Sequence, residues 1–404
     1  MESWMNQVTT SMTGNLGETA EQVSQPKGKK INILFIIDEL KVGAGTERHL
    51  VHLVSRLNKE WYNVMVCCFE GGENEMKKEI VRHGVPFINL DLKKMYTLKA
   101  LIKAGELSKI VRKHNIDIVQ TYHFKSDTFG VMVSKLSSAK KIVSSRRDIG
   151  DSKKPRQILL NKIMNPFINN FIMVCDEVGR RSHDNERIPC EKMVTIYNGV
   201  DLNRFKFGEV NRSTELADTY DIQKGDFVVG TVAMFRPEKA YNIFFQGMEK
   251  AASQIANLKV LVIGHGPESV QYMNYCNQGS LKGIVKFAGY IEDPERYLPL
   301  MDVFCLVPNK REGFSNAILE AMATGRPVIA TDVGGNAEAV VNGETGIVIP
   351  PDNADKLSEA IMYFHNDPST MVWMGKNGRR RVERFFSLER MISNHKMLYQ
   401  QMMT

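Results

Sequence analysis

Two glutamates eight residues apart, Glu312 and Glu320, flank a potential helix start at Ser315. Chance alone yields glutamate pairs at this spacing, so the surrounding residues must decide their role. Ser is a favoured helix N-cap residue, and the N–H groups that follow it, at Asn316 and Ala317, could bind a diphosphate. Glu320 could then accept hydrogen bonds from a ribose, and Glu312 would lie near a sugar on the diphosphate. The pattern favours a site for a nucleoside diphosphate sugar.

A second charged segment follows the apolar run 227–233 and contains Arg236 and Lys239. Cations at the end of a strand could stabilise the negative charge that develops on a departing diphosphate. The alternative for either residue is an ordinary solvated surface charge. We therefore treat both as candidate donor-binding residues.

Two glycine-containing turns also follow apolar runs. The first contains Gly43 and Gly45 and leads into a helix that begins near Thr46. Glycines let backbone N–H groups approach a phosphate closely, but Arg48 stands where a dinucleotide fingerprint needs a third glycine. A plain glycine turn capped by Thr46 remains open. Gly264 begins the second turn, which is a weak signal by itself.

Three histidines can be ranked by position. His123 follows the apolar run 117–120, so it should lie at the end of a strand, where ligands bind in open α/β sheets. A structural role remains the alternative for an isolated histidine. His49 and His52 share a helix face, but no third metal ligand is in reach, and we interpret both as ordinary helix residues.

Short apolar runs alternate with helix-length segments along most of the chain, which is typical of βαβ units. The first series of predicted strands is 31–37, 63–69, 86–90, 117–120, 141–145, 171–175 and 193–198. The second series is 227–233, 259–263, 285–288, 302–307, 327–330 and 346–349. The sequence therefore predicts an α/β protein with two doubly wound parallel sheets.

The chain has 404 residues, too many for a single core, and we expect two domains. The polar segment 201–224 looks like a linker, which gives domains over 31–205 and 206–386. A terminal helix, 387–404, could pack back on the first domain. The N-terminal stretch 1–30 is polar and is predicted to be a disordered tail.

Composition excludes several classes of protein. Hydrophobic residues make up 43% and charged residues 25%, as in soluble globular enzymes rather than disordered or collagenous chains. The longest apolar runs have about seven residues, far fewer than the ~20 that span a bilayer. The N-terminus lacks the apolar core of a signal peptide, so we expect a cytoplasmic protein. The six cysteines are scattered along the chain, and we predict that they are reduced thiols in the core.

Positive charge is concentrated in one segment. Residues 93–162 contain seventeen Lys and Arg against five Asp and Glu, a local charge of +12 in a chain with +7 overall. Within it, the stretch 153–168 places apolar residues at helical spacing behind a basic cluster. Such a stretch could bind an anionic membrane surface, and we expect 93–165 to do so. The alternative is that the apolar residues face the sheet while the lysines are solvated.

At this point the sequence resembles the retaining glycosyltransferases of family 4, from about Ile31 to the C-terminus. The resemblance rests on the block 312–338, on Tyr197-Asn-Gly199, on Gly43-Ala-Gly45 and on Pro237-Glu-Lys239. It implies the GT-B fold, with two facing Rossmann-like domains and a cleft between them. It also implies that His123 lies beside the reacting carbon, that Lys239 binds the donor phosphates, and that Glu312 contacts the donor sugar. The full set of expected donor-binding residues is Gly43, Gly45, Arg236, Lys239, Gly264, Phe314, Ser315, Asn316, Ala317 and Glu320.

The chain departs from the family pattern at two positions. Met234 stands where the family usually has an arginine, and Ala240 replaces the usual glycine. Arg236 could replace the missing arginine, because residues two apart in an extended segment point to the same side.

The resemblance implies transfer with retention of configuration by front-face attack, in which the leaving diphosphate accepts the proton of the acceptor. The sequence has no Asp-x-Asp triplet, and we expect no metal cofactor. The expected partners are a nucleotide-sugar donor and a glycan or lipid-linked acceptor, at the inner face of the membrane, and no nucleic acid. A non-catalytic nucleotide-sugar-binding protein and a sugar-nucleotide epimerase or phosphorylase of similar architecture remain alternatives.

Overall fold

A computed structural model of the chain describes residues 29–43, 45–208, 212 and 215–404. The predicted tail, 1–30, lies outside these residues except for its last two. The chain divides into two compact units. The first contains residues up to Asn198 together with Leu388–Thr404, and the second spans Gly199–Ser387. The division lies seven residues before the predicted boundary at 205/206.

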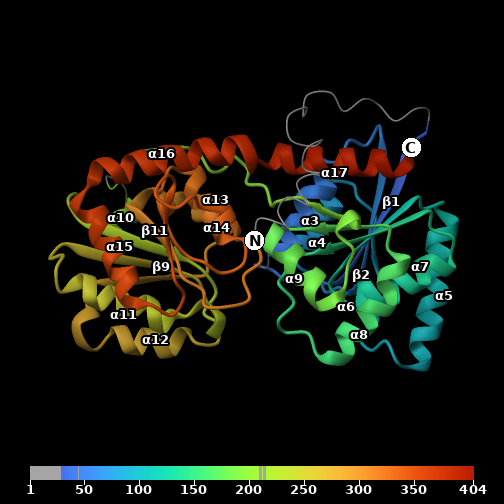
Figure 1. Cartoon of the computed structure of the whole chain (residues 1–404), viewed down its shortest axis with the longest axis horizontal. Coiled ribbons are helices and arrows are strands. Elements are labelled where there is room, and N and C mark those ends of the chain that lie inside the picture. The colour runs from blue at the N-terminus through green and yellow to red at the C-terminus, as the bar shows by residue number, and fades with distance from the viewer. Residues whose placement is uncertain (1–28, 44, 209–211, 213–214) are drawn as a thin grey trace. The chain divides into compact units, whose positions relative to one another are not determined.

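The first unit is built on a seven-stranded parallel sheet in the order β3-β2-β1-β4-β5-β6-β7 (Figure 1). The central strands are rich in Ile, Val and Phe and are buried on both faces, as expected for a parallel sheet covered by helices. Its strands are β1 (Ile31–Glu39), β2 (Tyr62–Glu70), β3 (Phe87–Asn89), β4 (Ile118–Tyr122), β5 (Lys141–Arg146), β6 (Asn170–Met173) and β7 (Met193–Thr195).

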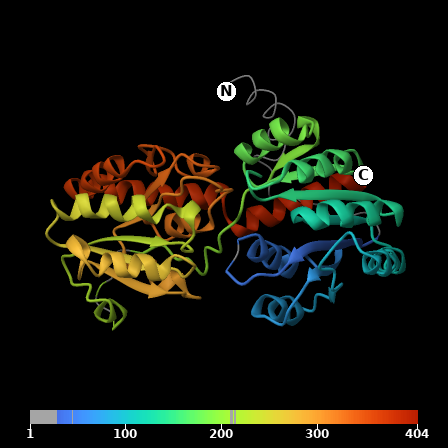
Figure 2. The ribbon, with the colours of Figure 1, turned by 90° about the horizontal axis from the view of Figure 1, so that it is seen from below.

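Helices cover both faces of this sheet (Figure 2). They are α3 (Gly45–Arg56), α4 (Glu75–Arg82), α5 (Leu98–Lys113), α6 (His123–Lys125), α7 (Val131–Leu136), α8 (Pro155–Met164), α9 (Asp176–Glu186) and the C-terminal α17 (Leu388–Met403). Helix α17 packs beside α3 and buries Leu388, Leu398 and Tyr399 in the core of the first unit. The last helix therefore returns to the first unit after the second sheet is complete.

The second unit has a six-stranded parallel sheet in the order β10-β9-β8-β11-β12-β13. Its strands are β8 (Phe227–Val232), β9 (Leu258–Ile263), β10 (Val285–Gly289), β11 (Val303–Leu306), β12 (Val328–Thr331) and β13 (Gly346–Ile349). Its helices are α10 (Glu215–Thr219), α11 (Tyr241–Ala252), α12 (Ser269–Cys276), α13 (Asn316–Ala323), α14 (Asn336–Ala339), α15 (Ala354–Asn366) and α16 (Pro368–Phe385). The two parallel sheets confirm the predicted α/β fold class.

The predicted linker over 201–224 is wrong as a connection between domains. The whole segment belongs to the second unit and includes helix α10. Arg204 in this segment donates to Glu295 at 2.9 Å, and Phe205 is buried. The segment has few apolar residues because charged side chains make several of its contacts. These contacts attach it to the second unit.

The strand order of each sheet reverses once. Consecutive strands run outward from β1 to β3, and the chain then returns to place β4 on the other side of β1. The second sheet repeats this at β8 and β11. Ligands of open α/β sheets bind beyond the carboxyl ends of the two strands at such a switch point. The fold thus directs attention to the segments after β1, β4, β8 and β11.

Candidate active site

The segment after β8 and the segment after β11 are joined by an ion pair. Lys239 Nζ lies 2.5 Å from Glu312 Oε2, and both side chains are largely shielded from solvent. Seventy-three residues separate them in sequence, so only the adjacency of β8 and β11 brings them together. Ala240, directly after the lysine, has a left-handed backbone with φ 49°. A non-glycine residue in this conformation is strained, and strain of this kind is common where a loop positions a functional side chain.

Glycines hold the loops around this ion pair close together. A Cβ atom at Gly264, after β9, would lie 1.9 Å from the carbonyl oxygen of Ala233, after β8. One at Gly334, after β12, would lie 2.0 Å from the carbonyl oxygen of Glu312. Both approaches are to backbone atoms, which cannot move aside as a side chain can. Gly264, expected to approach a donor, is thus also required for packing, and Gly334 supports Glu312 in a way that the sequence analysis missed.

Helix α13 begins beside the ion pair. Ser315 occupies the N-cap position, but its side chain makes no cap hydrogen bond, which corrects the expectation that it caps the helix. The side chain of Asn316 has a buried Oδ1 atom with no partner among the described residues. Phe314 is buried, and its ring lies 5.3 Å from that of Phe386. The loop is therefore anchored by Phe314, while the first turn of α13 keeps polar groups for a ligand.

Glu320 is half-buried on α13 and interacts electrostatically with Arg204. Burial by itself lowers the pKa of Arg204, but Glu295 and Glu320 outweigh it and hold the pKa above its usual value. Arg204 also donates to the carbonyl oxygen of Glu292 at 2.6 Å. Sequence reasoning missed Arg204 because it lies in the segment interpreted as a linker.

Arg236 is placed differently from the other candidates. Its backbone N–H donates to the carbonyl of Met234 at 2.9 Å, so the chain turns at Phe235. The sequence analysis had assumed an extended segment at this point. Phe235 is fully buried, while Met234 and Arg236 are both exposed. Within the part of the chain that is described, the Arg236 guanidinium joins no ion pair. It remains available to a ligand without being fixed by the protein.

In the first unit, the turn after β1 carries the predicted Gly43 and Gly45. Gly43 has φ 81°, and Gly45 is the first residue of α3. Glu47, in the first turn of α3, is only 4% exposed. Burial raises the pKa of Glu47, and the nearby His123 opposes that increase. The turn after β1 therefore meets the segment that follows β4, as the strand order requires.

His123 directly follows β4 and has φ 72°, a left-handed conformation that is unusual for histidine. The next residues, Ser126–Gly130, form a π-helical turn, which is common at functional sites. Asp38 fixes this segment, because its carboxylate accepts the N–H groups of Lys125 at 2.8 Å and Ser126 at 2.7 Å. Burial raises the pKa of Asp38, and the charge of His123 again opposes the shift. The strain at His123 is thus held in place by hydrogen bonds to its neighbours.

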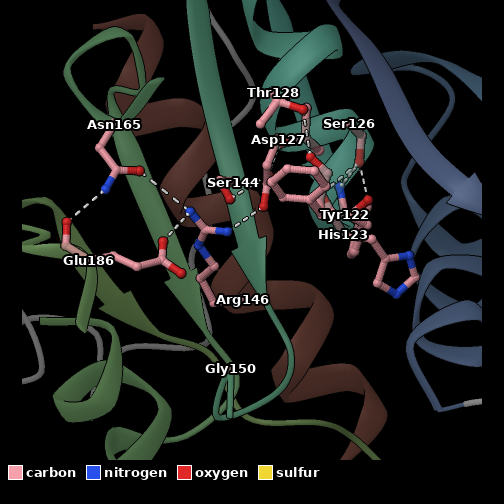
Figure 3. A network of polar contacts seen from close by, with 12 residues as sticks. Tyr122, His123, Ser126, Asp127, Thr128, Ser144, Arg146, Gly150, Asn165 and Glu186 are labelled. Atoms are coloured by element: carbon pink, nitrogen blue, oxygen red, sulfur yellow. Dashed lines mark hydrogen bonds and ion pairs between the residues drawn. The ribbon is translucent and has the colours of Figure 1, made fainter. Parts of the chain in front are cut away.

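A buried polar network lies behind His123 (Figure 3). Asp127 accepts hydrogen bonds from Thr121 at 2.6 Å and Ser144 at 2.7 Å, and it pairs with Arg146 at 2.5 Å. The other side of the Arg146 guanidinium meets Glu186 at 3.0 Å. The imidazole of His123 points away from this network (Figure 3). The network was not predicted, because its members come from four separated segments.

Residues 43–204 match the profile of Glycosyltransferase Family 4, and residues 213–381 match that of Glycosyl transferases group 1. The chain belongs to glycosyltransferase family 4. The family is therefore the one that the sequence motifs predicted, and the enzyme is a glycosyltransferase.

Two curated relatives and one solved structure illustrate the similarity. A capsular polysaccharide biosynthesis glycosyltransferase, CapM of Staphylococcus aureus, is 32% identical over 193 residues, which are 47% of this chain and 49% of that protein. An Escherichia coli galactosyltransferase named for a GlcNAc-diphosphoundecaprenol acceptor is 24% identical over 88% of this chain and 93% of that protein. The crystal structure of HepE from Anabaena in complex with UDP superposes with a TM-score of 0.82 at 19% identity, covering 92% of this chain and all of that one. The superposition supports the GT-B fold.

Two further features bear on the chemistry of this glycosyltransferase. Among the described residues, no group of three His, Cys, Asp or Glu is arranged to hold a metal ion. His52 Nδ1 lies 3.1 Å from Arg56, and His49 is buried, so neither histidine of α3 is set up as a ligand. None of the six cysteines, all of which lie in the described part of the chain, forms a disulfide, and five are buried.

Proposed function

We propose that this glycosyltransferase moves a sugar from a nucleotide-sugar donor to a glycan or lipid-linked acceptor, with retention of configuration, in surface polysaccharide or glycolipid synthesis. The observation that carries the proposal is the ion pair of Lys239 and Glu312 beside the uncapped start of α13. A lysine, a carboxylate and free N–H groups at one switch point suit the phosphates and the sugar of such a donor. The names of CapM and of the Escherichia coli galactosyltransferase support the acceptor class.

The residue roles follow from this arrangement. When the donor binds, the ion pair of Lys239 with Glu312 would weaken. Lys239 would then bind the donor phosphates and stabilise the charge on the leaving group. Glu312 would then accept hydrogen bonds from the sugar, and Glu320 from the ribose. Retention by front-face attack requires no protein nucleophile, since the leaving diphosphate takes the proton of the acceptor. The protein contributes position and charge.

We also propose that no metal takes part, because Lys239 and the first turn of α13 supply positive charge where the leaving group would lie. Activity should therefore survive treatment with EDTA. Complete loss of turnover with the chelator, restored by Mg²⁺ or Mn²⁺, would contradict this part of the proposal.

The acceptor side of the proposal includes a membrane surface on the first unit. At the start of α5, large apolar residues stand in solvent: Tyr96 is 77% exposed, Leu98 83% and Leu101 71%. The surrounding lysines Lys93, Lys94 and Lys99 are exposed as well. Apolar side chains ringed by lysines suit the interface of an anionic bilayer.

Helix α8 also exposes apolar side chains. Leu159 is 59% exposed and Ile163 51%, whereas Ile158 and Met164 are half-buried and Asn161 is buried. This favours a membrane surface over the alternative in which all four apolar side chains face the sheet. None of the described helices is long and apolar enough to cross a membrane. We propose peripheral attachment through the region 93–165.

The test is a panel of nucleotide sugars, each measured by thermal shift and by release of free nucleotide without acceptor. We expect one base and sugar to raise the melting temperature and to be hydrolysed slowly. A donor that binds but is never turned over, with or without glycan and lipid-linked acceptors, would favour a non-catalytic binding protein. Interconversion of two nucleotide sugars would favour an epimerase.

A further inference from the structure

A cavity of about 160 Å³ opens in the first unit at the carboxyl ends of β4 and β5. Its lining includes His123, Ser145, Arg146, Arg147, Asp148 and Lys153. All of these residues belong to the first unit.

Two of the cations in the lining are neutralised by the protein. Arg146 is 4% exposed and pairs with Asp127 at 2.5 Å and Glu186 at 3.0 Å (Figure 3). Lys153 pairs with the other carboxylate oxygen of Glu186. These side chains build the wall of the cavity, and their charges are already compensated.

Arg147 is the exception in this wall. One end of its guanidinium donates to the amide oxygen of Asn198, which carries no charge. The Nη1 atom is buried and has no hydrogen-bond partner in the described part of the chain. Burial lowers the pKa of Arg147 to about 10, and the opposing contributions come from Tyr122 and Cys175 rather than from a carboxylate. Arg147 is therefore a shielded cation that the described residues leave without an anion.

The two acidic residues in the lining do not fill this role. Asp127 is taken up by Arg146, Thr121 and Ser144. Asp148 is exposed, and its carboxylate accepts the N–H of Gly150 at 2.7 Å. Its charge raises the pKa of Arg146, with no such effect on Arg147.

A second unsatisfied donor lines the same cavity as Arg147. Ser145 is 2% exposed, lines the same cavity, and its Oγ atom has no partner among the described residues. A hydroxyl and a guanidinium N–H that are buried and unpaired are costly unless a ligand completes them. Arginine and a hydroxyl together are suited to a phosphate or carboxylate group.

We propose that Arg147 and Ser145 bind an oxyanion of the acceptor, a phosphate ester or a carboxylate, in this cavity. The identity of the ligand as the acceptor rests on the proposed function, in which His123, another residue of the lining, lies beside the reacting carbon. The anionic group would then set which acceptors are used, because a neutral acceptor leaves the arginine unpaired.

Hydrogen–deuterium exchange of the full chain tests the site directly, with inorganic pyrophosphate and malate as probes against chloride at equal ionic strength. We expect one of the two probes to slow exchange in peptides that cover 145–157, and the choice between them separates phosphate from carboxylate. Peptides that cover 313–323 report separately on the donor site. Unchanged exchange over 145–157 with both probes would overturn the proposal.

Variants distinguish binding by Arg147 from a structural role. Arg147→Gln should abolish the protection over 145–157, Arg147→Lys should restore part of it, and Arg82→Gln, an exposed arginine on α4, should leave it unchanged. Without a probe, Arg147→Gln should melt no lower than the wild type, because it removes an unpaired buried charge. Equal protection in Arg147→Gln and wild type would overturn the assignment. If Arg147→Gln does not fold, Ser145→Ala serves in its place. The probe concentration that gives half of the protection over 145–157 should then be at least severalfold higher than in the wild type.

The outcome also separates this proposal from the proposed function. Donor hydrolysis without acceptor should persist in Arg147→Gln, since Lys239, Glu312 and Glu320 belong to the second unit and do not depend on Arg147. Donor turnover without any protection over 145–157 would refute the oxyanion site alone. Protection over 145–157 in a protein that turns over no nucleotide sugar would refute the transferase proposal alone.

Discussion

The contact between Lys239 and Glu312 joins two residues of opposite charge that would otherwise each be costly to shield. In the absence of donor they neutralise one another. A bound diphosphate would give the lysine a second anion, which leaves the carboxylate able to accept hydrogen bonds from sugar hydroxyls. The pair is thus a resting arrangement that the donor would rearrange.

Removing either donor contact should weaken turnover without unfolding the protein. Lys239→Ala and Glu320→Ala should each cost about 1.5–3 kcal/mol, roughly a ten- to hundredfold loss in kcat/KM for the donor, because each removes a charge-assisted contact. Lys250→Ala is a matched control, since Lys250 forms an exposed ion pair with Asp355 on the surface of the same unit. Wild-type kinetics in either site variant, or an equal loss in the control, would contradict the assignment.

Arg236 tests whether the chain replaces the arginine that Met234 lacks. Arg236→Ala should raise the KM for the donor severalfold, because an exposed guanidinium free of protein carboxylates can reach a phosphate. The comparison is Arg296→Ala, another exposed arginine of the second unit that pairs with Asp293. If the two variants have the same KM, Arg236 does not act as the replacement.

The sequence predicted a site residue where it also predicted that the residue directly follows a strand. Glu312, Lys239 and His123 were all placed by the end of an apolar run. Their contacts were not predictable, because the pairing of Lys239 with Glu312 depends on the strand order. The left-handed φ of His123 and the lack of a partner for Arg147 Nη1 among the described residues could not be predicted from the sequence, since both depend on the surrounding fold.

Among the helices, α17 shows how a distant segment completes a core. His395 on α17 is fully buried, its ring lies 5.2 Å from that of His49 on α3, and its Nδ1 contacts the carbonyl of Met391 at 2.8 Å. Burial lowers the pKa of His395 to about 4 and also lowers the pKa of His49. Both histidines are therefore neutral in the folded protein near pH 7.

This pair predicts a loss of stability in acid. Between pH 6.5 and pH 4 the unfolded chain binds a proton at His395 that the folded chain does not, so stability is complete above pH 6.5 and falls toward pH 4. The loss from His395 alone should reach on the order of 3 kcal/mol at pH 4.

Thermal unfolding of His395→Gln and of the control His114→Gln, an exposed residue, measures this contribution. The fall in melting temperature between pH 6.5 and pH 4.5 should be smaller in His395→Gln than in the wild type and unchanged in the control. Parallel pH profiles for all three proteins would show that His395 does not contribute to the acid sensitivity.

Element types were predictable from apolar runs, and most predicted strands overlap the observed ones. The predicted run 31–37 corresponds to β1, Ile31–Glu39, and the run 346–349 coincides with β13. The sequence did not predict that the apolar residues at the start of α5 are exposed. Periodicity shows which residues share a helix face, but it does not show whether another element covers that face. The same holds for α8, whose buried residue proved to be Asn161.

For the molecule as a whole, charge is unequally divided, and the basic segment 93–162 lies entirely in the first unit. A +12 segment carries about 1 kcal/mol of attraction per basic residue close to an anionic surface. The exposed side chains of Leu98 and Leu101 would add apolar contact with the bilayer. The first unit therefore has both of the contributions that reversible membrane attachment needs.

Sedimentation with vesicles should show this attachment. The wild type should pellet with vesicles that contain phosphatidylglycerol and not with pure phosphatidylcholine, and high salt should release it by screening. Replacing Leu98 and Leu101 by Ser should weaken pelleting by about tenfold, since burying leucine contributes ~1.5–3 kcal/mol when complete. Trp373→Ser on α16 removes an apolar residue that is 49% exposed from the second unit and should have no effect. Equal pelleting with both lipids, or none with either, would favour an acceptor in solution.

The two-unit organisation followed from length and from two series of strands. The boundary at Asn198 did not, because the segment after it is polar and lacks periodicity although it packs on the second unit. The return of α17 to the first unit was predicted as a possibility, and its contacts with α3 and with the core of the first unit fix it there.

We propose that the enzyme transfers a sugar from a nucleotide donor with retention, through the residues around Lys239 and Glu312. Proton NMR of the reaction, with the donor selected by the panel, measures this in one experiment. An α-linked nucleotide sugar should give a product whose anomeric signal is α from the first turnover, at a rate that Lys239→Ala lowers at least tenfold. A β product would contradict retention, and nucleotide release that does not depend on Lys239 would contradict the site.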